Sequence, residues 1–293
     1  MEIKKILVLG SGLMGGGIAN VLAQAGYGVM LYDIAPERVQ AAIDEVAYRL
    51  GRKVAKNELS EQDKAKILAR MHPASSLEQD VPKADLIIEA ATENFDLKIK
   101  LFREVDKYVR QDAFIASNTS SMSITSLSTA ITNKENFLGM HFFAPVPIMR
   151  LLELVKGLRT SDEALAVGRQ IGEKLGKVLI VANDSPGFIV NRMLDIMLNE
   201  AVFLVMEGAA PEDIDNGMKA GCNHAMGPLE TIDLSGVDVM YACMQSFYAM
   251  FGDSKYRPAP LLRQMVESGY LGKKTGRGFY KYDANGNKIS EKK

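Results

Sequence analysis

The chain has 293 residues, 47% of them hydrophobic and 24% charged, and its formal net charge is −1. This length favours two domains, because single hydrophobic cores rarely grow beyond roughly 250–300 residues. The balanced charge argues against nucleic acid as a partner, and no apolar run is long enough to cross a bilayer. The two cysteines lack metal-ligand spacing, so we expect no metal site and two buried free thiols. No leader pattern precedes the first predicted strand, so we expect a cytoplasmic protein.

The N-terminal segment carries the pattern of a dinucleotide-binding turn. An apolar strand predicted over 6–9 is followed by glycines at the spacing G-x-G-x-x-G, namely Gly10, Gly12 and Gly15. Gly10 permits the tight turn and Gly12 lets the backbone approach a pyrophosphate. Gly15 lets the following helix, predicted over 18–25, pack closely on the strand. The helix start adds unpaired N–H groups and the positive end of its dipole, which favour a bound phosphate.

Asp33 closes the second predicted strand, over 29–32, and lies 18 residues after Gly15. Its carboxylate can accept hydrogen bonds from both hydroxyls of an adenosine ribose and would repel a 2′-phosphate. The pattern therefore favours NAD over NADP. The alternatives are glycines that serve packing alone and a solvated acid at a strand end.

Strands and helices alternate up to residue 185, which is typical of a doubly wound, mostly parallel sheet. Further strands are predicted over 85–90, 113–118, 137–141, 151–155 and 178–181, and helices over 36–71, 96–109 and 162–175. Such sheets bind ligands beyond the carboxyl ends of their strands. Asp33, Glu89, residues 117–120 and His141 lie at these ends.

The pattern changes at residues 183–187, where Pro186 and Gly187 interrupt the alternation. Only helical periodicity follows, with helices predicted over 188–206, 210–220, 236–251 and 259–268. The first of these carries apolar residues all round, Met193 among them, so we expect it to be buried. We predict a dinucleotide-binding domain over 1–185 and an all-α domain over 186–293, with a polar tail that frays beyond Tyr282.

His141 and Glu153 are the candidates for proton transfer among the titratable groups. Glu153 lies inside an apolar strand, where a carboxylate is costly unless it is paired. Paired with the imidazole of His141, it would hold one tautomer and poise a general base. The alternative is a core histidine bonded to the backbone, with Glu153 at a domain interface. His72, before Pro73, is expected in a structural loop.

Two polar residues could bind a substrate oxygen. Ser120 follows a strand in a run of Ser and Thr, which is also typical of turns and caps. Asn191 lies on the apolar helix of the second domain, where its amide needs partners that could be other helices or a ligand.

The whole chain resembles the 3-hydroxyacyl-CoA dehydrogenase family in its short, single-enzyme form. The motifs that carry the resemblance lie in both predicted domains, at residues 10–15, 117–121, 141–147, 186–192, 223–228 and 269–280. The resemblance implies a reversible, NAD-dependent conversion of a short (S)-3-hydroxyacyl-CoA, such as 3-hydroxybutyryl-CoA, to the 3-oxoacyl-CoA. It also implies a homodimer formed through the helical domain.

The resemblance implies a role for each site residue. His141 is expected to be the general acid/base, oriented by Glu153, with Ser120 and Asn191 binding the reacting oxygen and the thioester carbonyl. The expected cofactor-binding residues are Gly10, Gly12, Leu13, Met14, Gly15, Asp33, Ala90, Glu93, Lys98 and Asn118. Those expected near the phosphates of CoA are Arg52, Lys53 and Lys56, for which a solvated helix face is the alternative.

Two residues depart from the family pattern. Ala144 stands where the family usually has Asn after His-Phe-Phe, and Ala225 stands where it usually has Pro after Asn-His. Ala144 leaves open how the loop after His141 is held. Two other functions are considered: a dehydrogenase of free 3-hydroxy acids, which would use a lysine as acid/base, and a non-catalytic dinucleotide-binding protein on the same fold.

Overall fold

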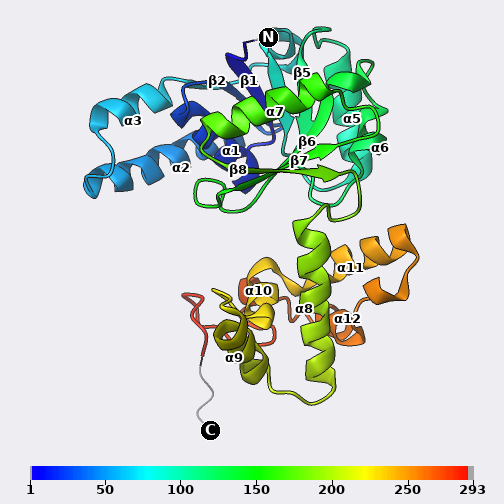
Figure 1. Cartoon of the computed structure of the whole chain (residues 1–293). Coiled ribbons are helices and arrows are strands. Elements are labelled where there is room, and N and C mark those ends of the chain that lie inside the picture. The colour runs from blue at the N-terminus through cyan, green and yellow to red at the C-terminus, as the bar shows by residue number, and fades with distance from the viewer. Residues whose placement is uncertain (1, 290–293) are drawn as a thin grey trace. The chain divides into compact units, whose positions relative to one another are not determined.

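The computed structural model describes residues 2–289 of the chain (Figure 1). Its contacts divide the chain into two compact units, and the division falls between Ser185 and Pro186. This is the point where the sequence pattern changes from alternating strands and helices to helices. Within the described residues, no helix is long and apolar enough to cross a membrane.

The first unit is built on one eight-stranded sheet with the strand order β3-β2-β1-β4-β5-β6-β7-β8. All neighbouring strands are parallel except β6 and β7, which are antiparallel. The predicted fold, a doubly wound and mostly parallel sheet followed by a helical domain, is confirmed. The strands are β1 (Lys5–Leu9), β2 (Gly28–Tyr32), β3 (Met71–Pro73), β4 (Leu86–Glu89), β5 (Phe114–Ser117), β6 (Phe137–Phe142), β7 (Leu151–Lys156) and β8 (Val178–Asn183).

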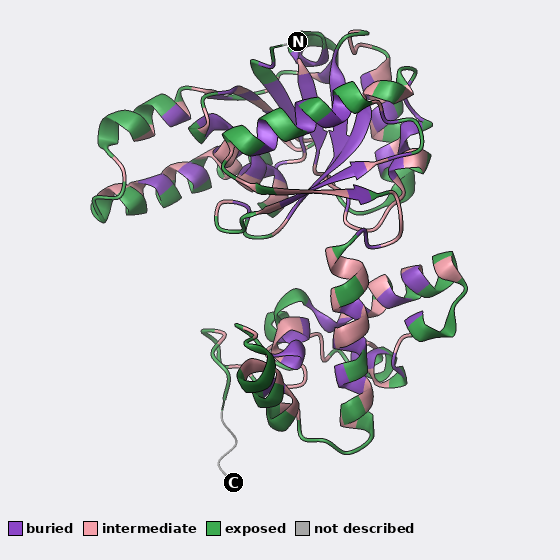
Figure 2. Cartoon of the chain, in the orientation of Figure 1, coloured by how far each residue is buried: buried purple, intermediate pink, exposed green. Residues whose placement is uncertain are grey.

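Seven α-helices in the described part of this unit connect the strands and cover the sheet. They are α1 (Leu13–Gln24), α2 (Pro36–Ala55), α3 (Glu61–Leu68), α4 (Leu77–Asp80), α5 (Phe95–Asp106), α6 (Ile124–Ser128) and α7 (Asp162–Lys174). Short 3₁₀ turns, η1 (Val81–Lys83) and η2 (Lys134–Asn136), complete the set. In Figure 2 the strands are buried, while the helices turn exposed faces outward.

The segment over 36–71, predicted to be helical, contains two helices, and its last residue, Met71, begins strand β3. Ser60 caps α3 by accepting a hydrogen bond from the Asp63 N–H at 3.0 Å, which starts a new helix after the turn at 56–59. Helices α2 and α3 form a hairpin that extends away from the sheet (Figure 1). His72 lies in edge strand β3 rather than in a loop.

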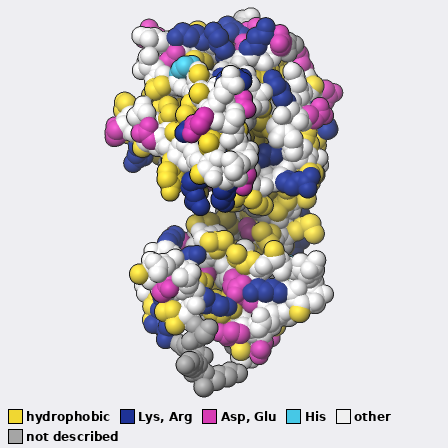
Figure 3. Space-filling model, turned by 90° about the vertical axis from the view of Figure 1, so that its left-hand side faces the viewer, with side chains coloured by type: hydrophobic (Ala, Val, Ile, Leu, Met, Phe, Trp, Pro, Cys, Tyr) yellow, Lys and Arg dark blue, Asp and Glu magenta, His cyan; other side chains and the backbone are white. Residues whose placement is uncertain are grey.

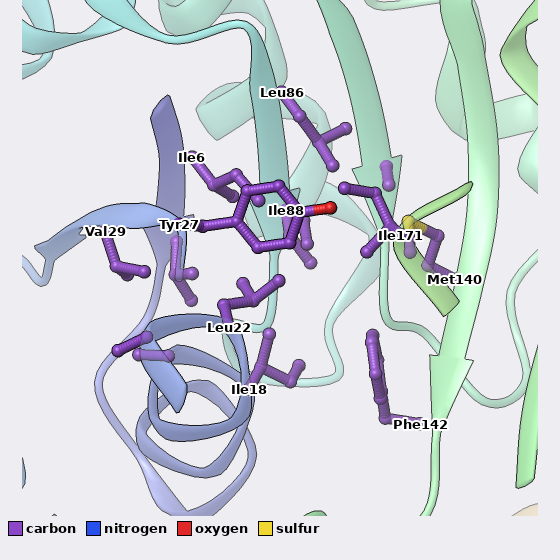
Figure 4. Close-up of a cluster of buried hydrophobic side chains, with 14 of the residues drawn as sticks. Ile6, Ile18, Leu22, Tyr27, Val29, Leu86, Ile88, Met140, Phe142 and Ile171 are labelled. Atoms are coloured by element: carbon purple, nitrogen blue, oxygen red, sulfur yellow. The ribbon is translucent and has the colours of Figure 1, made fainter. Parts of the chain in front are cut away.

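The core of the first unit packs the apolar faces of α1 and α7 against the strands. Figure 4 shows Ile18 and Leu22 of α1, Ile88 of β4 and Ile171 of α7 around the ring of Tyr27. Tyr27 is 1% exposed, and its hydroxyl is the one fully buried side-chain polar atom among the described residues that has no hydrogen-bond partner. Burial of the hydroxyl raises the pKa of Tyr27.

Tyr27→Phe is expected to stabilise the protein, because it removes a buried donor that forms no hydrogen bond. An unsatisfied buried polar group costs about 1–3 kcal/mol, and about 1 kcal/mol shifts Tm by roughly 2–4 °C in a domain of this size. Thermal unfolding followed by circular dichroism measures the shift, with Tyr48→Phe at an exposed position as the control. A lower Tm for Tyr27→Phe would mean that the hydroxyl has a stabilising partner.

The second unit is a cluster of helices around an apolar core. The helices are α8 (Val190–Met206), α9 (Pro211–Cys222), α10 (Pro228–Ser235), α11 (Val237–Phe251) and α12 (Pro260–Glu267), with 3₁₀ turns η3 (Ser254–Tyr256) and η4 (Lys273–Thr275). Proline at the first helical position starts α9, α10 and α12. The sequence analysis missed α10.

Two expectations about burial in this unit are wrong. Helix α8 buries Leu198, Ala201 and Val202, but Met193 is 73% exposed, so only one side of the helix faces the core. Both thiols are free as expected, yet Cys222 is exposed at the end of α9. Apolar composition alone did not distinguish a buried helix from one with an exposed apolar face.

Two buried aspartates tie the last segment of the chain to the helices. Asp233 of α10 accepts hydrogen bonds from the N–H groups of Phe279 and Tyr280, both at 2.9 Å. Asp215 of α9 accepts one from the N–H of Leu229 and one from the Tyr280 hydroxyl, at 2.8 and 2.7 Å. The chain beyond position 282 does not fray at once: residues 283–287 form a turn, and residues 290–293 lie outside the described part.

Glu230 is held by two lysines beside this segment, Lys219 at 2.5 Å and Lys288 at 2.7 Å. Burial acts to raise its pKa, but the lysines and the Gly227 N–H outweigh burial and lower the pKa of Glu230 to about 2. The ion pairs therefore stabilise the fold above the ordinary pKa of the carboxyl. Their contribution is lost as the pH falls through the folded pKa.

Glu230→Gln is expected to lower the free energy of unfolding by about 1 kcal/mol at pH 7, because Lys219 and Lys288 lose their shared anionic partner. The difference in Tm between wild type and variant should stay constant at neutral pH. It should shrink as the pH falls from roughly 4.5 toward 2. Thermal unfolding across this pH range measures the difference, and one that persists at pH 2 would contradict the assignment.

Candidate active site

The glycine-rich turn connects β1 to α1. Gly10 has φ +99°, and a Cβ there would lie 2.6 Å from the Ala90 carbonyl oxygen. A Cβ at Gly15 would lie 1.8 Å from the Gly10 carbonyl oxygen, so both positions require glycine for the fold itself. A Cβ at Gly12 would meet no atom within 4 Å. The protein does not need glycine at this position, which fits a backbone kept open for a ligand.

Helix α1 begins at Leu13, inside the glycine motif, and not at residue 18 as predicted. Gly12 is its N-cap and provides no side chain for capping. The first N–H groups of the helix, around Leu13 and Met14, therefore point out of the helix start without intrahelical partners. Leu13 is 66% exposed. This combination of open backbone and helix N-terminus fits the pyrophosphate of a dinucleotide.

Asp33 follows β2 and faces the glycine-rich turn. Its Oδ2 accepts hydrogen bonds from the N–H and the hydroxyl of Ser11, both at 2.9 Å, and its Oδ1 accepts one from Ala35 at 3.2 Å. Burial acts to raise the pKa of Asp33, but these bonds and the Arg38 charge hold it below its usual value. An ionised carboxylate thus borders a cavity of about 180 Å³ lined by residues 32–34, 36, 39 and 73–76.

A second cavity, of about 430 Å³, lies between α1 and α2. It is lined by Ser11 and Gly12 on one side and by Arg38, Glu45 and Arg49 of α2 on the other. Arg38 and Arg49 are 11 residues apart, about three helical turns, so they lie on the same face of α2. Arg49 belongs to the cationic run that the sequence shows at this end of the helix, whereas Arg38 was not predicted to line a cavity. Figure 3 views the first unit from the side of α2 and α3, where Lys and Arg side chains are prominent.

The predicted basic cluster consists of Arg52 and Lys53 in the last turn of α2 and Lys56 at its C-cap. All three are exposed, and within the described residues none of them forms an ion pair. The lining of the cavity between α1 and α2 does not include them.

His141 and Glu153 form a buried pair across the antiparallel strands β6 and β7. The two residues lie directly opposite each other in the register, which places their side chains on the same face of the sheet. Nδ1 of His141 lies 2.7 Å from Oε2 of Glu153, and the residues are 5% and 0% exposed. The structure therefore joins the two residues that the sequence singled out.

Ser120 lies in the turn that follows β5, where Glu93 holds the backbone. Oε1 of Glu93 accepts hydrogen bonds from the Ser120 N–H at 3.0 Å and from the Thr119 hydroxyl at 2.6 Å. Burial acts to raise the pKa of Glu93, but the Lys98 ammonium, together with these donors, holds it below its usual value. The Ser120 hydroxyl is bound more weakly, at 3.4 Å from the same oxygen.

Lys98 and Asn118 connect this turn to the neighbouring strands. Lys98 of α5 is 1% exposed and forms ion pairs with Glu89 and Glu93. The side-chain oxygen of Asn118 accepts a hydrogen bond from the Phe142 N–H at 2.8 Å, next to His141. Ala90 continues β4 beside the glycine-rich turn, its N–H donating to the Leu9 carbonyl.

Lys177, which was not predicted from the sequence to have a role, holds the loop after His141. Its ammonium donates to the carbonyls of Val146 and Met149, both at 2.6 Å. Burial of the ammonium lowers the pKa of Lys177. No local pattern marks a lysine whose partners lie about 30 residues earlier in the chain. The loop that contains Ala144 is thus held by the residue that directly precedes β8.

Asn191 lies in the first turn of α8, in the second unit, and is half-buried. The other predicted site residues belong to the first unit. Within the described residues, no group of three or more His, Cys, Asp or Glu side chains could hold a metal ion.

Comparisons with known proteins cover both units. Residues 5–185 match the family model of the 3-hydroxyacyl-CoA dehydrogenase NAD binding domain, and residues 187–282 match that of the C-terminal domain. A crystal structure of (S)-3-hydroxybutyryl-CoA dehydrogenase from Ralstonia eutropha is 48% identical, with a TM-score of 0.94, over 96% of this chain and all of that one. Probable 3-hydroxybutyryl-CoA dehydrogenases from Deinococcus radiodurans and Bacillus subtilis are 46% and 43% identical, over 95% and 97% of this chain and 100% and 99% of theirs. The expected cofactor, NAD, is confirmed.

Proposed function

Because the chain belongs to the 3-hydroxyacyl-CoA dehydrogenase family, we propose that it interconverts (S)-3-hydroxybutyryl-CoA and acetoacetyl-CoA with NAD(H). The observation that carries the proposal is the buried pair of His141 and Glu153. A carboxylate and an imidazole fixed opposite each other are suited to moving a proton during oxidation of an alcohol.

His141 acts as the general acid/base in this proposal. Glu153 accepts the Nδ1 proton, which fixes the tautomer and the ring orientation, so Nε2 is the atom that transfers the proton. In oxidation, Nε2 takes the proton of the C3 hydroxyl, and in reduction the protonated ring returns it. NAD(H), held at the start of α1 and by Asp33, would supply the hydride chemistry at C3. Ser120 donates to the reacting oxygen, and Asn191 binds the thioester carbonyl.

The open backbone at Gly12 supports the proposed set of cofactor-binding residues. The N–H groups at the start of α1, from Gly12 to Gly15, would hold the pyrophosphate, and Asp33 would accept from the ribose hydroxyls. The remaining residues would border the nicotinamide half: Gly10, Ala90 and Asn118 directly after β1, β4 and β5, Glu93 in the loop after β4, and Lys98 on α5.

The test is a spectrophotometric assay of acetoacetyl-CoA reduction, in which NADH absorbance falls. Turnover with acetoacetyl-CoA and none with free acetoacetate supports the proposal. The reverse preference would favour a dehydrogenase of free 3-hydroxy acids. NADH binding without turnover of either substrate would favour a non-catalytic dinucleotide-binding protein.

Arg52, Lys53 and Lys56 are proposed to attract the phosphates of CoA, since all three cations are exposed. Replacing Lys53 and Lys56 by glutamine is expected to raise KM for acetoacetyl-CoA by about three- to thirtyfold at low salt, because each exposed contact contributes about 0.3–1 kcal/mol. The effect should shrink at high salt, because exposed charges are screened. An unchanged KM at low salt would leave the cluster as a solvated helix face.

We also propose a cytoplasmic homodimer that forms through the second unit. The exposed apolar residues Met193, Leu204 and Met206 of α8 support an interface there, and the exposed thiol of Cys222 supports a reducing compartment. Sedimentation equilibrium measures the oligomeric state. A monomer at micromolar concentration would contradict the interface.

A further inference from the structure

We propose that Glu89, acting through Lys98 and Glu93, positions the Ser120 turn for the reaction. This inference rests on the role proposed above for Ser120. Glu89 itself is a positioning residue, because its contacts are to other side chains and to the backbone. The four residues form a continuous chain of ion pairs and hydrogen bonds within the first unit.

Glu89 is a fully buried carboxylate at the carboxyl end of β4, 0% exposed. Its Oε2 accepts a hydrogen bond from the Ser117 hydroxyl at 2.6 Å, and its Oε1 accepts one from the Ala91 N–H at 2.6 Å. The Lys98 ammonium donates to the same Oε1 at 2.5 Å. Each oxygen therefore has a fixed donor, and the side chain joins the ends of β4 and β5 to α5.

Lys98, which is held by Glu89, also forms an ion pair with Glu93 and so fixes the position of the Glu93 carboxylate. Its ammonium lies 3.2 Å from Oε2 of Glu93, and it is 1% exposed. Burying charges costs more than the ion pair usually returns, so apolar side chains would often stabilise such a position equally well or better. A buried ammonium between two carboxylates is therefore better explained by the geometry it imposes than by stability.

Glu93 connects this chain of contacts to the turn that contains Ser120. Its Oε1 gathers donors from three successive residues, Thr119, Ser120 and Ser121. The backbone of Ser120 is held at 3.0 Å, but its hydroxyl is at 3.4 Å. A fixed backbone with a weakly held hydroxyl lets Ser120 turn its donor to a substrate oxygen without moving the turn.

The experiment is a double-mutant cycle between Glu89→Gln and Ser120→Ala, with kcat and KM measured for acetoacetyl-CoA and NADH. Glu89→Gln is expected to lower kcat about tenfold in the wild-type background and less than twofold when Ser120 is already alanine. Coupling of this kind means that Glu89 acts through Ser120. The same factor in both backgrounds would overturn the proposal.

Asp85→Asn is the matched control for the loss of a partly buried carboxylate. Asp85 precedes β4 at its other end, where it accepts from the N–H groups of Lys4 and Lys5 and pairs with Arg110. We expect this variant to lower Tm but to keep kcat within twofold. If Asp85→Asn lowers kcat as far as Glu89→Gln at an equal loss of Tm, the effect is one of stability and the proposal is wrong.

Two further measurements keep the test decisive. If Glu89→Gln does not fold, Glu89→Asp takes its place in the cycle, because the shorter side chain withdraws the carboxylate from Lys98 and keeps the charge. NADH binding is followed by NADH fluorescence, and the affinity of Glu89→Gln should stay within threefold of wild type. A greater loss would place Glu89 in cofactor binding and overturn the proposal. Absence of acetoacetyl-CoA turnover in the wild type refutes the proposed function instead.

Discussion

His141→Gln is expected to lower kcat by about 10²–10⁴-fold, the usual contribution of a positioned general acid/base. Glutamine can keep a hydrogen bond near Glu153 but cannot transfer a proton. NADH affinity should change little, since the residues proposed to bind the cofactor lie at the ends of other strands. Stopped-flow or steady-state reduction of acetoacetyl-CoA measures kcat, and NADH fluorescence measures binding.

Glu153→Gln provides the comparison for this variant. It keeps the size of the side chain at the 2.7 Å contact but removes the charge that orients the ring. We expect a smaller loss of kcat than for His141→Gln, because the proton-transferring group remains. If His141→Gln retains nearly wild-type kcat, His141 is a core histidine and another group transfers the proton.

Asp33→Ala is expected to weaken NADH binding by about tenfold or more, because hydrogen bonds to a charged group contribute roughly 1.5–3 kcal/mol each. It should improve NADPH binding at the same time. The repulsion of a 2′-phosphate is removed, while the Arg38 charge that acts on Asp33 remains nearby. The ratio of kcat/KM for the two cofactors is the measurement.

Asp33→Asn is the matched variant, since it removes the charge and keeps the shape. It should lie between wild type and Asp33→Ala in NADH affinity. A wild-type enzyme that prefers NADPH would show that the carboxylate does not select the cofactor.

The glycine-rich turn could be predicted from the sequence because its physics is local. Gly10 is required by its φ of +99° and Gly15 by its contact with Gly10 of the same motif, and Asp33 follows the adjacent strand. Two other local signals mark helix starts: Ser60 caps α3, and Pro228 is the first residue of α10. Neither start was predicted, because the prediction of helices relied on longer apolar patterns.

The pairing of His141 with Glu153 could be proposed but not demonstrated from the sequence. A separation of 12 residues places them opposite each other only because β6 and β7 are antiparallel in that register. The contacts of Lys177 and the buried position of Glu89 depend on strands that are far apart in the sequence. Such residues have no local pattern, since their partners are set by the topology of the sheet.

The contacts of Asp215 and Asp233 have a consequence for folding during synthesis. Their donors include Phe279 and Tyr280, which are synthesised 46 and 47 residues after Asp233 and, for Tyr280, 65 residues after Asp215. Until then the second unit holds two carboxylates without these partners, and its core is incomplete. The first unit can fold as soon as β8 is made, whereas the second must wait until Phe279 and Tyr280 have been synthesised. A messenger RNA that stops shortly before codon 279 would thus yield a folded nucleotide-binding unit attached to an unfolded, protease-sensitive remainder.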